Sequence, residues 1–190
     1  MYNTLSEQLW GRSVSQESLY IVLLGGKHEK ANVEIHDVIP VVAEDLKQIY
    51  PYLKQQWFGM ERGLHIDGWM KINGTTYQQP NEQPKHYRIE VKTSPQKELA
   101  LKLYLINLGA YLPTQFGEVH KYVVVAAKNK TEAKIQGKLA IEKAWFKPHT
   151  DAIVDIDDCL ELKKIQQKYL HLIEEDFDEN TFVNDYIVIG

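Results

Sequence analysis

The sequence has one cysteine, no long apolar run and no excess of positive charge, and each absence excludes a class of protein. Cys159 has no partner, so an intrachain disulfide framework and a thiolate zinc cluster are excluded. No apolar stretch approaches the roughly 20 residues that a membrane-spanning helix needs. Residues 1–18 lack the apolar core and the small-residue cleavage site of a signal peptide. We therefore expect a cytoplasmic protein in a reducing compartment, without a membrane.

The charge balance argues against nucleic acid as a partner. The chain has 22 Lys and Arg against 26 Asp and Glu, a net charge of −4 over 190 residues. Phosphate binding depends on concentrated Lys and Arg side chains, and the lysines gather only over residues 128–147. Acidic residues interrupt them there, which is typical of a solvated helix face. A protein partner or a small ligand remains open.

Three blocks of sequence recur at one offset, 84 residues (103 − 19). The paired blocks are residues 19–25 with 103–109, Glu34-x-His36 with Glu118-x-His120, and His65-x-Asp67 with His149-x-Asp151. Blocks that share one register indicate an internal repeat. We therefore predict two tandem copies of one unit.

Each copy has the pattern strand, strand, helix, strand, strand. In the first copy the strands are predicted at residues 19–24, 33–42, 64–72 and 86–91, and the helix over 46–57. In the second copy the strands are predicted at residues 103–108, 119–126, 153–156 and 169–173, and the helix over 131–146. A ferredoxin-like split arrangement needs two helices per unit, whereas the periodicity gives one. The predicted fold class is α+β, with tandem duplicated ββαββ units that are β-grasp-like and related by a pseudo-twofold axis.

The predicted boundaries follow composition. A polar link around Pro95 separates the copies, and an acidic stretch precedes the last apolar residues. The segments are an N-terminal extension (1–18), a first repeat unit (19–94), a second repeat unit (95–176), and a C-terminal acidic loop and strand (177–190).

The polar residues that both copies keep are the candidate ligand-binding residues. They are Glu34, His36, His65, Asp67, Glu118, His120, His149 and Asp151. Residues two apart in a strand point to the same face, so each carboxylate has a histidine neighbour. Carboxylates orient imidazoles and raise their basicity, which serves metal ligation, general base catalysis and structural hydrogen bonding alike.

A structural role is the preferred interpretation of these pairs. Each histidine would then be buried with both ring nitrogens paired, and His36→Ala would cost about 1–3 kcal/mol. In a ligand site, the same residues would line a cleft and be partly exposed. No metal ligand or catalytic residue is assigned, because neither pair has the helical spacing of His-Glu-x-x-His. The segment that contains Asp155, Asp157 and Asp158 is not a calcium-binding loop, because it lacks the glycine and the closing glutamate that such a loop requires.

Four motifs of the first copy resemble the bacterial domain-of-unknown-function family 1543. They are Leu24-Gly25-Gly26, Glu34-Ile35-His36-Asp37, Gln56-Trp57-Phe58-Gly59 and Leu64-His65-Ile66-Asp67. The second copy departs at Lys121, Ala144 and Lys147, and the similarity covers roughly residues 19–173. The resemblance implies a bacterial protein with a tandem unit, and it brings no activity, cofactor or substrate.

The sequence thus predicts a non-enzymatic binding or scaffold protein. The lack of a recognised nucleophile, phosphate loop or metal signature motivates this prediction. The alternative is a metal-dependent, hydrolase-like enzyme that uses the Glu-x-His and His-x-Asp pairs. No cofactor is named.

Overall fold

The structure is a computed structural model, and it describes residues 16–97, 100–111, 114–142 and 154–190. Its elements are β1 (Ser18–Gly26), β2 (Ile35–Ala43), η1 (Leu46–Ile49), α1 (Tyr50–Gln56), β3 (His65–Ile72), β4 (Gly74–Tyr77), β5 (Lys85–Lys92), β6 (Lys102–Tyr111), β7 (Glu118–Ala127), α2 (Lys130–Glu142), β8 (Val154–Glu161), β9 (Lys164–Ile165), β10 (Lys168–Glu174) and β11 (Thr181–Val188). The chain is therefore α+β, as predicted.

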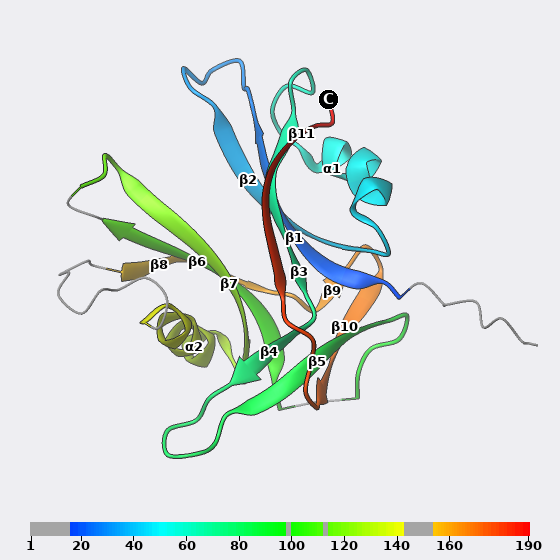
Figure 1. Ribbon diagram of the computed structural model, residues 1–190, viewed down its shortest axis with the longest axis vertical. Coiled ribbons are helices and arrows are strands. Elements are labelled where there is room, and N and C mark those ends of the chain that lie inside the picture. The colour runs from blue at the N-terminus through cyan, green and yellow to red at the C-terminus, as the bar shows by residue number, and fades with distance from the viewer. Residues whose placement is uncertain (1–15, 98–99, 112–113, 143–153) are drawn as a thin grey trace, which may run out of the picture.

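The strands of the described residues form three sheets (Figure 1). Sheet A has the order β11-β3-β1-β2, sheet B the order β4-β5-β10-β9, and sheet C the order β7-β6-β8. Their strand pairs are antiparallel. The central strands β1 and β6 are the aliphatic runs that recur in the sequence, since a strand with neighbours on both sides and both faces covered needs apolar side chains throughout.

The alternation of side chains in β1 divides sheet A into two faces. Tyr20, Val22 and Leu24 pack with α1, while Leu19 and Ile21 point to the opposite face. A 3-10 turn precedes α1, which begins at Tyr50 with a proline in its first turn, where a missing N–H costs nothing.

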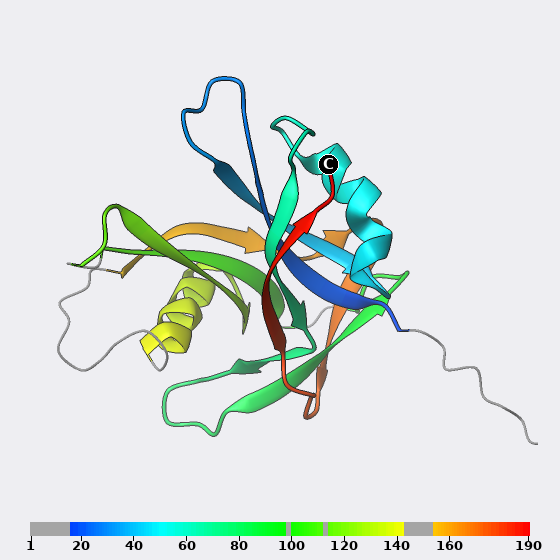
Figure 2. The same ribbon diagram turned by 45° about the horizontal axis from the view of Figure 1, so that its top comes forward.

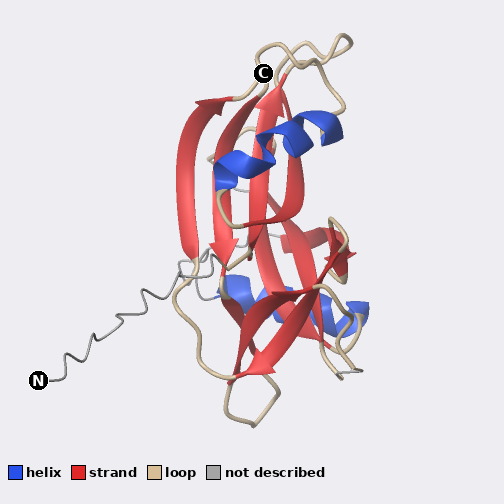
Figure 3. Ribbon diagram, turned by 90° about the vertical axis from the view of Figure 1, so that its right-hand side faces the viewer, coloured by secondary structure: helices blue, strands red, loops and turns tan. Residues whose placement is uncertain are grey.

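Sheet C has the same division. Tyr104, Ile106 and Leu108 pack with α2, while Leu103 and Leu105 join the core that contains Leu19 and Ile21. Figure 3 shows each helix lying across a separate group of strands. The helices thus cover the outer faces of sheets A and C, and we call the two opposed faces the inner faces.

The inner faces pack together at one end and separate at the other. Figure 1 and Figure 2 show β2 diverging from the β6–β7 hairpin. A cavity of about 400 Å³ lies between the inner faces and is lined by residues of both sheets. Those residues are His36, Asp37, Val38, Leu105, Asn107, Tyr122, Asp158 and Leu160. The fold therefore has a cleft between sheets A and C.

The β-grasp arrangement is not confirmed, because the strands after each three-stranded group leave their own sheet. β5 pairs with β10 in sheet B, from Lys92 with Tyr169 to Tyr87 with Glu174. β11 returns to sheet A and pairs with β3. The sequence did not predict β4, whose four residues Gly-Thr-Thr-Tyr are too few for a clear period-2 pattern. The two halves of the chain are thus interleaved.

Candidate metal site

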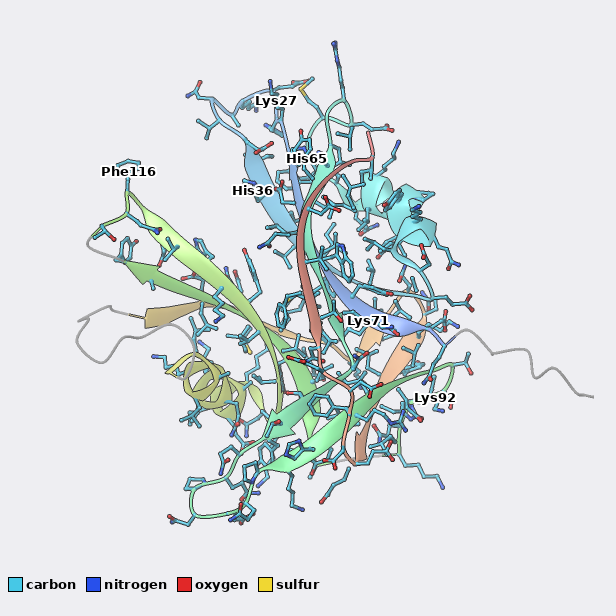
Figure 4. All side chains as sticks on the ribbon, viewed as in Figure 1. Lys27, His36, His65, Lys71, Lys92 and Phe116 are labelled. Carbon is cyan, nitrogen blue, oxygen red and sulfur yellow. The ribbon has the colours of Figure 1, made fainter. Side chains whose placement is uncertain are left out.

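The first cluster consists of Glu34, His36, His65 and Asp67, at one end of sheet A. Glu34 directly precedes β2, His36 lies in β2, and the other two lie in β3. Figure 4 shows His36 and His65 near each other at the end of the sheet, where β2 and β3 begin. Three ligand atoms, one each from Glu34, His65 and Asp67, lie within 4.8 Å of one another. The structure therefore brings together the four candidates of the first copy.

A β-bulge sets the position of Asp67. In the β1–β3 ladder, Leu24 pairs with Ile66 and Leu23 pairs with Gly68, so Asp67 has no partner in β1. An extra residue of this kind bends the strand and re-aims a side chain. Asp67 Oδ1 consequently lies 3.2 Å from His65 Nε2.

The hydrogen bonds of His65 determine which of its ring nitrogens carries a proton. His65 Nδ1 lies 2.9 Å from the Gly63 carbonyl oxygen, and a carbonyl oxygen only accepts, so Nδ1 is the donor. In the neutral ring Nε2 then presents a lone pair. This atom lies 3.1 Å from Glu34 Oε1 and 3.2 Å from Asp67 Oδ1, which are also acceptors. Nε2 has no hydrogen-bond partner, and the side chain is only 3% exposed. Three electron-rich atoms thus converge, and a cation, either a proton or a metal ion, would relieve their repulsion.

Gly25 of β1 forms the floor of the first cluster. A Cβ atom on this residue would lie 2.4 Å from Asp67 Oδ2 and 2.6 Å from His65 Nε2. Both distances are far inside van der Waals contact. Any other residue here would push the carboxylate or the imidazole away, so the cluster requires glycine.

His36 lies at the rim of the first cluster. Its Nε2 is 3.1 Å from Asp67 Oδ2 and 3.7 Å from Glu34 Oε2, and its side chain is 47% exposed. The structural interpretation of the polar pairs predicted that His36 is buried and that both of its ring nitrogens are paired. The exposed ring instead lines the cleft between the sheets.

Tyr186 of β11 covers part of His65. The two ring centroids are 4.3 Å apart, and Tyr186 lies where the β11–β3 register shifts between Asn184 and Ile187. The terminal strand therefore contributes an aromatic wall to the first cluster. No sequence pattern indicated this contact, because it joins strands that are far apart in the chain.

The second cluster consists of Glu118, His120 and Asp157, in sheet C. One ligand atom of each lies within 4.8 Å of the others. His120 Nδ1 is 3.1 Å from Asp157 Oδ2 and 3.2 Å from Asn107 Oδ1. The His120 and Asp157 side chains are 39% and 31% exposed, so this cluster is more open than the first.

The second cluster includes a residue that the repeat did not predict. Gly109 pairs with Asp155, as Gly25 pairs with His65, so the offset on this strand is 90 residues (155 − 65). In the ladders, Asp155 and Asp157 therefore have the positions of His65 and Asp67, six residues beyond His149 and Asp151, which lie outside the described residues. Ile66-Asp67 recurs as Ile156-Asp157, which is the sequence signal that could have identified Asp157.

Cys159 of β8 is not part of either cluster. Burial raises the pKa of its thiol, and Lys130 and Lys134 lower it only in part. A thiol with a raised pKa is a poor nucleophile and a poor metal ligand at neutral pH. Cys159 therefore has the environment of an unreactive, partly buried side chain.

Comparisons with known proteins reach the fold but no activity. The family described as Domain of Unknown Function (DUF1543) matches residues 31–80, which supports the family resemblance. That segment contains all four residues of the first cluster. No curated protein matches. The crystal structure of a protein Il1583 from Idiomarina loihiensis is 25% identical, with a TM-score of 0.65 over 92% of this chain and 99% of that chain. The fold as a whole is therefore shared with a solved structure.

Proposed function

We propose that this protein binds a divalent transition metal ion through Glu34, His65 and Asp67. The observation that carries the proposal is the buried Nε2 atom of His65, which has no hydrogen-bond partner and faces two carboxylate oxygens. One imidazole and two carboxylates suit zinc, manganese or iron(II). Metal binding gives concrete content to the binding function that the sequence predicts.

The surroundings of His65 favour a metal ion over a proton. Metal-ligating histidines donate their other N–H to a carbonyl or carboxylate, and His65 Nδ1 donates to Gly63 in this way. The glycine floor and the β-bulge support the same proposal, since both bring oxygen atoms close to Nε2. A single Nε2–H proton would donate mainly to one carboxylate oxygen, whereas a metal ion would bind both oxygens together with Nε2.

The test is the metal content of purified protein that has been stripped with a chelator and then incubated with zinc. We expect one equivalent of tightly bound zinc in the wild type and at least a tenfold loss of zinc affinity in His65→Ala. His171→Ala is the matched control, because His171 lies in β10 of sheet B and its Nε2 is 2.8 Å from the Ser94 carbonyl oxygen, outside the first cluster. Unchanged zinc binding by His65→Ala would refute the proposal.

A metal-dependent hydrolase is the second candidate function. Three protein ligands leave open positions on the metal ion, as catalytic zinc sites do. His36 is exposed at the rim of the first cluster and lines the cavity of about 400 Å³, which would give a substrate access to a bound metal ion. A screen of phosphoester, ester and peptide substrates with and without added metal tests this candidate. Activity that is independent of metal would exclude it.

We also propose that sheets A and C descend from one duplicated unit in a bacterial, cytoplasmic protein. Supporting this, β1 and β6 each lie between two antiparallel neighbours, and each ladder shifts register at an equivalent residue, Leu24 or Leu108. An overlay of β1–β3 on β6–β8 that fails to superpose Gly25 on Gly109 would contradict the duplication.

Fractionation of the source cells tests the proposed cytoplasmic compartment. No helix in the described residues is long and apolar enough to cross a membrane.

A further inference from the structure

We infer that Glu118, His120 and Asp157 form a second cation site, and that it takes an oxygen-preferring divalent ion such as Mn²⁺. The inference rests on the proposed function of the first cluster, because the second cluster repeats its construction in the other sheet. Variants of each cluster separate the two claims.

The bulge of the first cluster recurs in sheet C. Leu108 pairs with Ile156 and Asn107 pairs with Asp158, so Asp157 is left out of the β6–β8 ladder as Asp67 is left out of the β1–β3 ladder. The side chain of the extra residue turns toward the central strand. Asp157 is therefore placed by the same backbone device as Asp67.

Two carboxylates converge above the glycine of β6. A Cβ atom on Gly109 would lie 2.2 Å from Glu118 Oε1 and 2.8 Å from Asp157 Oδ2. Both oxygen atoms thus approach one point above the strand, and the two negatively charged carboxylates repel each other there. A divalent cation at that point would turn the repulsion into attraction.

The second cluster has the same three ligand types as the first and, in addition, an amide oxygen beside its imidazole. Asp155 has the ladder position that His65 has in sheet A, so the imidazole comes from His120 of β7 instead. The Asn107 amide oxygen lies 3.2 Å from His120 Nδ1, and the corresponding position of β1 is Leu23. Carboxylate and amide oxygens suit manganese and magnesium better than zinc. The greater exposure of the cluster predicts weaker binding.

Both clusters lie on the inner faces of their sheets. Gly25 is in alternation with Ile21 and Leu23, and Gly109 is in alternation with Leu105 and Asn107. The cavity between the inner faces is lined by His36 of the first cluster and by Asn107, which contacts the second. The two cation sites therefore face one cleft from opposite walls.

The experiment measures Mn²⁺ binding to the full chain after chelator treatment, by calorimetry and by the electron paramagnetic resonance signal of free Mn²⁺. We expect two equivalents in the wild type, with affinities at least tenfold apart. Asp157→Asn should remove the weaker equivalent and His65→Ala the tighter one. Glu118→Gln provides a second variant of the weaker site, and Asp178→Asn, at an exposed loop position, is the matched control. Circular dichroism checks that each variant is folded.

Each other outcome contradicts a stated claim. One equivalent that is lost in His65→Ala and kept in Asp157→Asn would overturn the second site and leave the proposed function in place. One equivalent that is lost only in Asp157→Asn would overturn the proposed function and support the second site. If the folded wild type binds neither Mn²⁺ nor zinc, both claims are wrong.

Discussion

At the scale of single residues, the first cluster depends on the missing Cβ atom of Gly25 and on the proton on His65 Nδ1. The absent Cβ leaves room for Asp67 Oδ2, and the Nδ1–H bond to Gly63 turns Nε2 toward the carboxylates. Neither feature adds to the charge of the site. Both determine where existing charges lie, and small displacements change metal affinity strongly.

Gly25→Ala should weaken metal binding at the first cluster at least tenfold, equivalent to about 1.4 kcal/mol. The added Cβ would displace His65 Nε2 or Asp67 Oδ2 from the position that the metal ion requires. Calorimetric titration with zinc measures the effect. Gly109→Ala is the matched control, since it adds the same atom in sheet C and should leave the first cluster unchanged. Equal losses in both variants would contradict the prediction.

His36→Ala should lower stability by less than about 1 kcal/mol, because exposed ion pairs contribute little. For a buried histidine, the expected loss of stability was about 1–3 kcal/mol. Because the His36 side chain is 47% exposed, the expected loss is now smaller. Thermal melts of the metal-free protein measure the difference.

His65→Ala should instead abolish the rise in melting temperature that added metal gives, because a ligand stabilises only the state that binds it. The same melts, repeated with zinc, measure this effect in the wild type, His36→Ala and His65→Ala. An undiminished zinc-induced shift in His65→Ala would contradict the assignment of Nε2 as a ligand.

At the scale of elements, a partly buried hydrogen bond connects α2 to sheet B. The Tyr77 hydroxyl of β4 donates to Glu132 Oε1 of α2 at 2.7 Å. Gln136 of the same helix donates from Nε2 to the Gln78 carbonyl oxygen at 2.6 Å. The helix of the second half is therefore held by a strand of the first half, and not only by its own sheet.

The connection through Tyr77 should make stability depend on pH in the alkaline range. Burial, followed by the hydrogen bond to Glu132, raises the pKa of Tyr77 from 10.0 to about 12. Because the folded pKa exceeds the unfolded value, this contribution is complete below about pH 10 and is lost as pH rises through 12. Urea melts at several pH values should show a steeper alkaline loss in the wild type than in Tyr77→Phe. Tyr111→Phe, at a tyrosine that is 60% exposed, should behave as the wild type.

At the scale of the whole molecule, the two halves share structure that neither completes alone. Sheet B pairs β5 of the first half with β10 of the second, and β11 extends sheet A. The core between the inner faces includes Leu19 and Ile21 together with Leu103 and Leu105. Separation of the halves would expose this core and an edge of β3 and β5.

Fragments 1–94 and 95–190 should each be poorly structured alone and should regain structure when they are mixed. Each fragment by itself leaves apolar surface and strand edges exposed, which a segment of this size does not tolerate. Amide dispersion in NMR spectra of the fragments and of their mixture measures the result. A well-dispersed spectrum of fragment 1–94 alone would show that the first half is an independent domain.

The sequence by itself determined the local features of this protein. Continuous aliphatic runs identified the central strands β1 and β6, and Glu34-x-His36 was correctly expected to point to one side of β2. The second prediction succeeds because side-chain direction in a strand follows from the period of two alone. The continuous apolar run of β1 follows from a strand that is covered on both faces.

Tertiary structure decided the features that depend on register and on pairing between distant strands. The choice of Asp157 over Asp151 depends on which residue of β8 lies beside Gly109, and the register of β8 on β6 differs by six positions from the common offset. The pairing of β5 with β10 and the contact of Tyr186 with His65 join residues far apart in sequence. Such contacts are selected by burial of the whole core, so no local pattern specifies them.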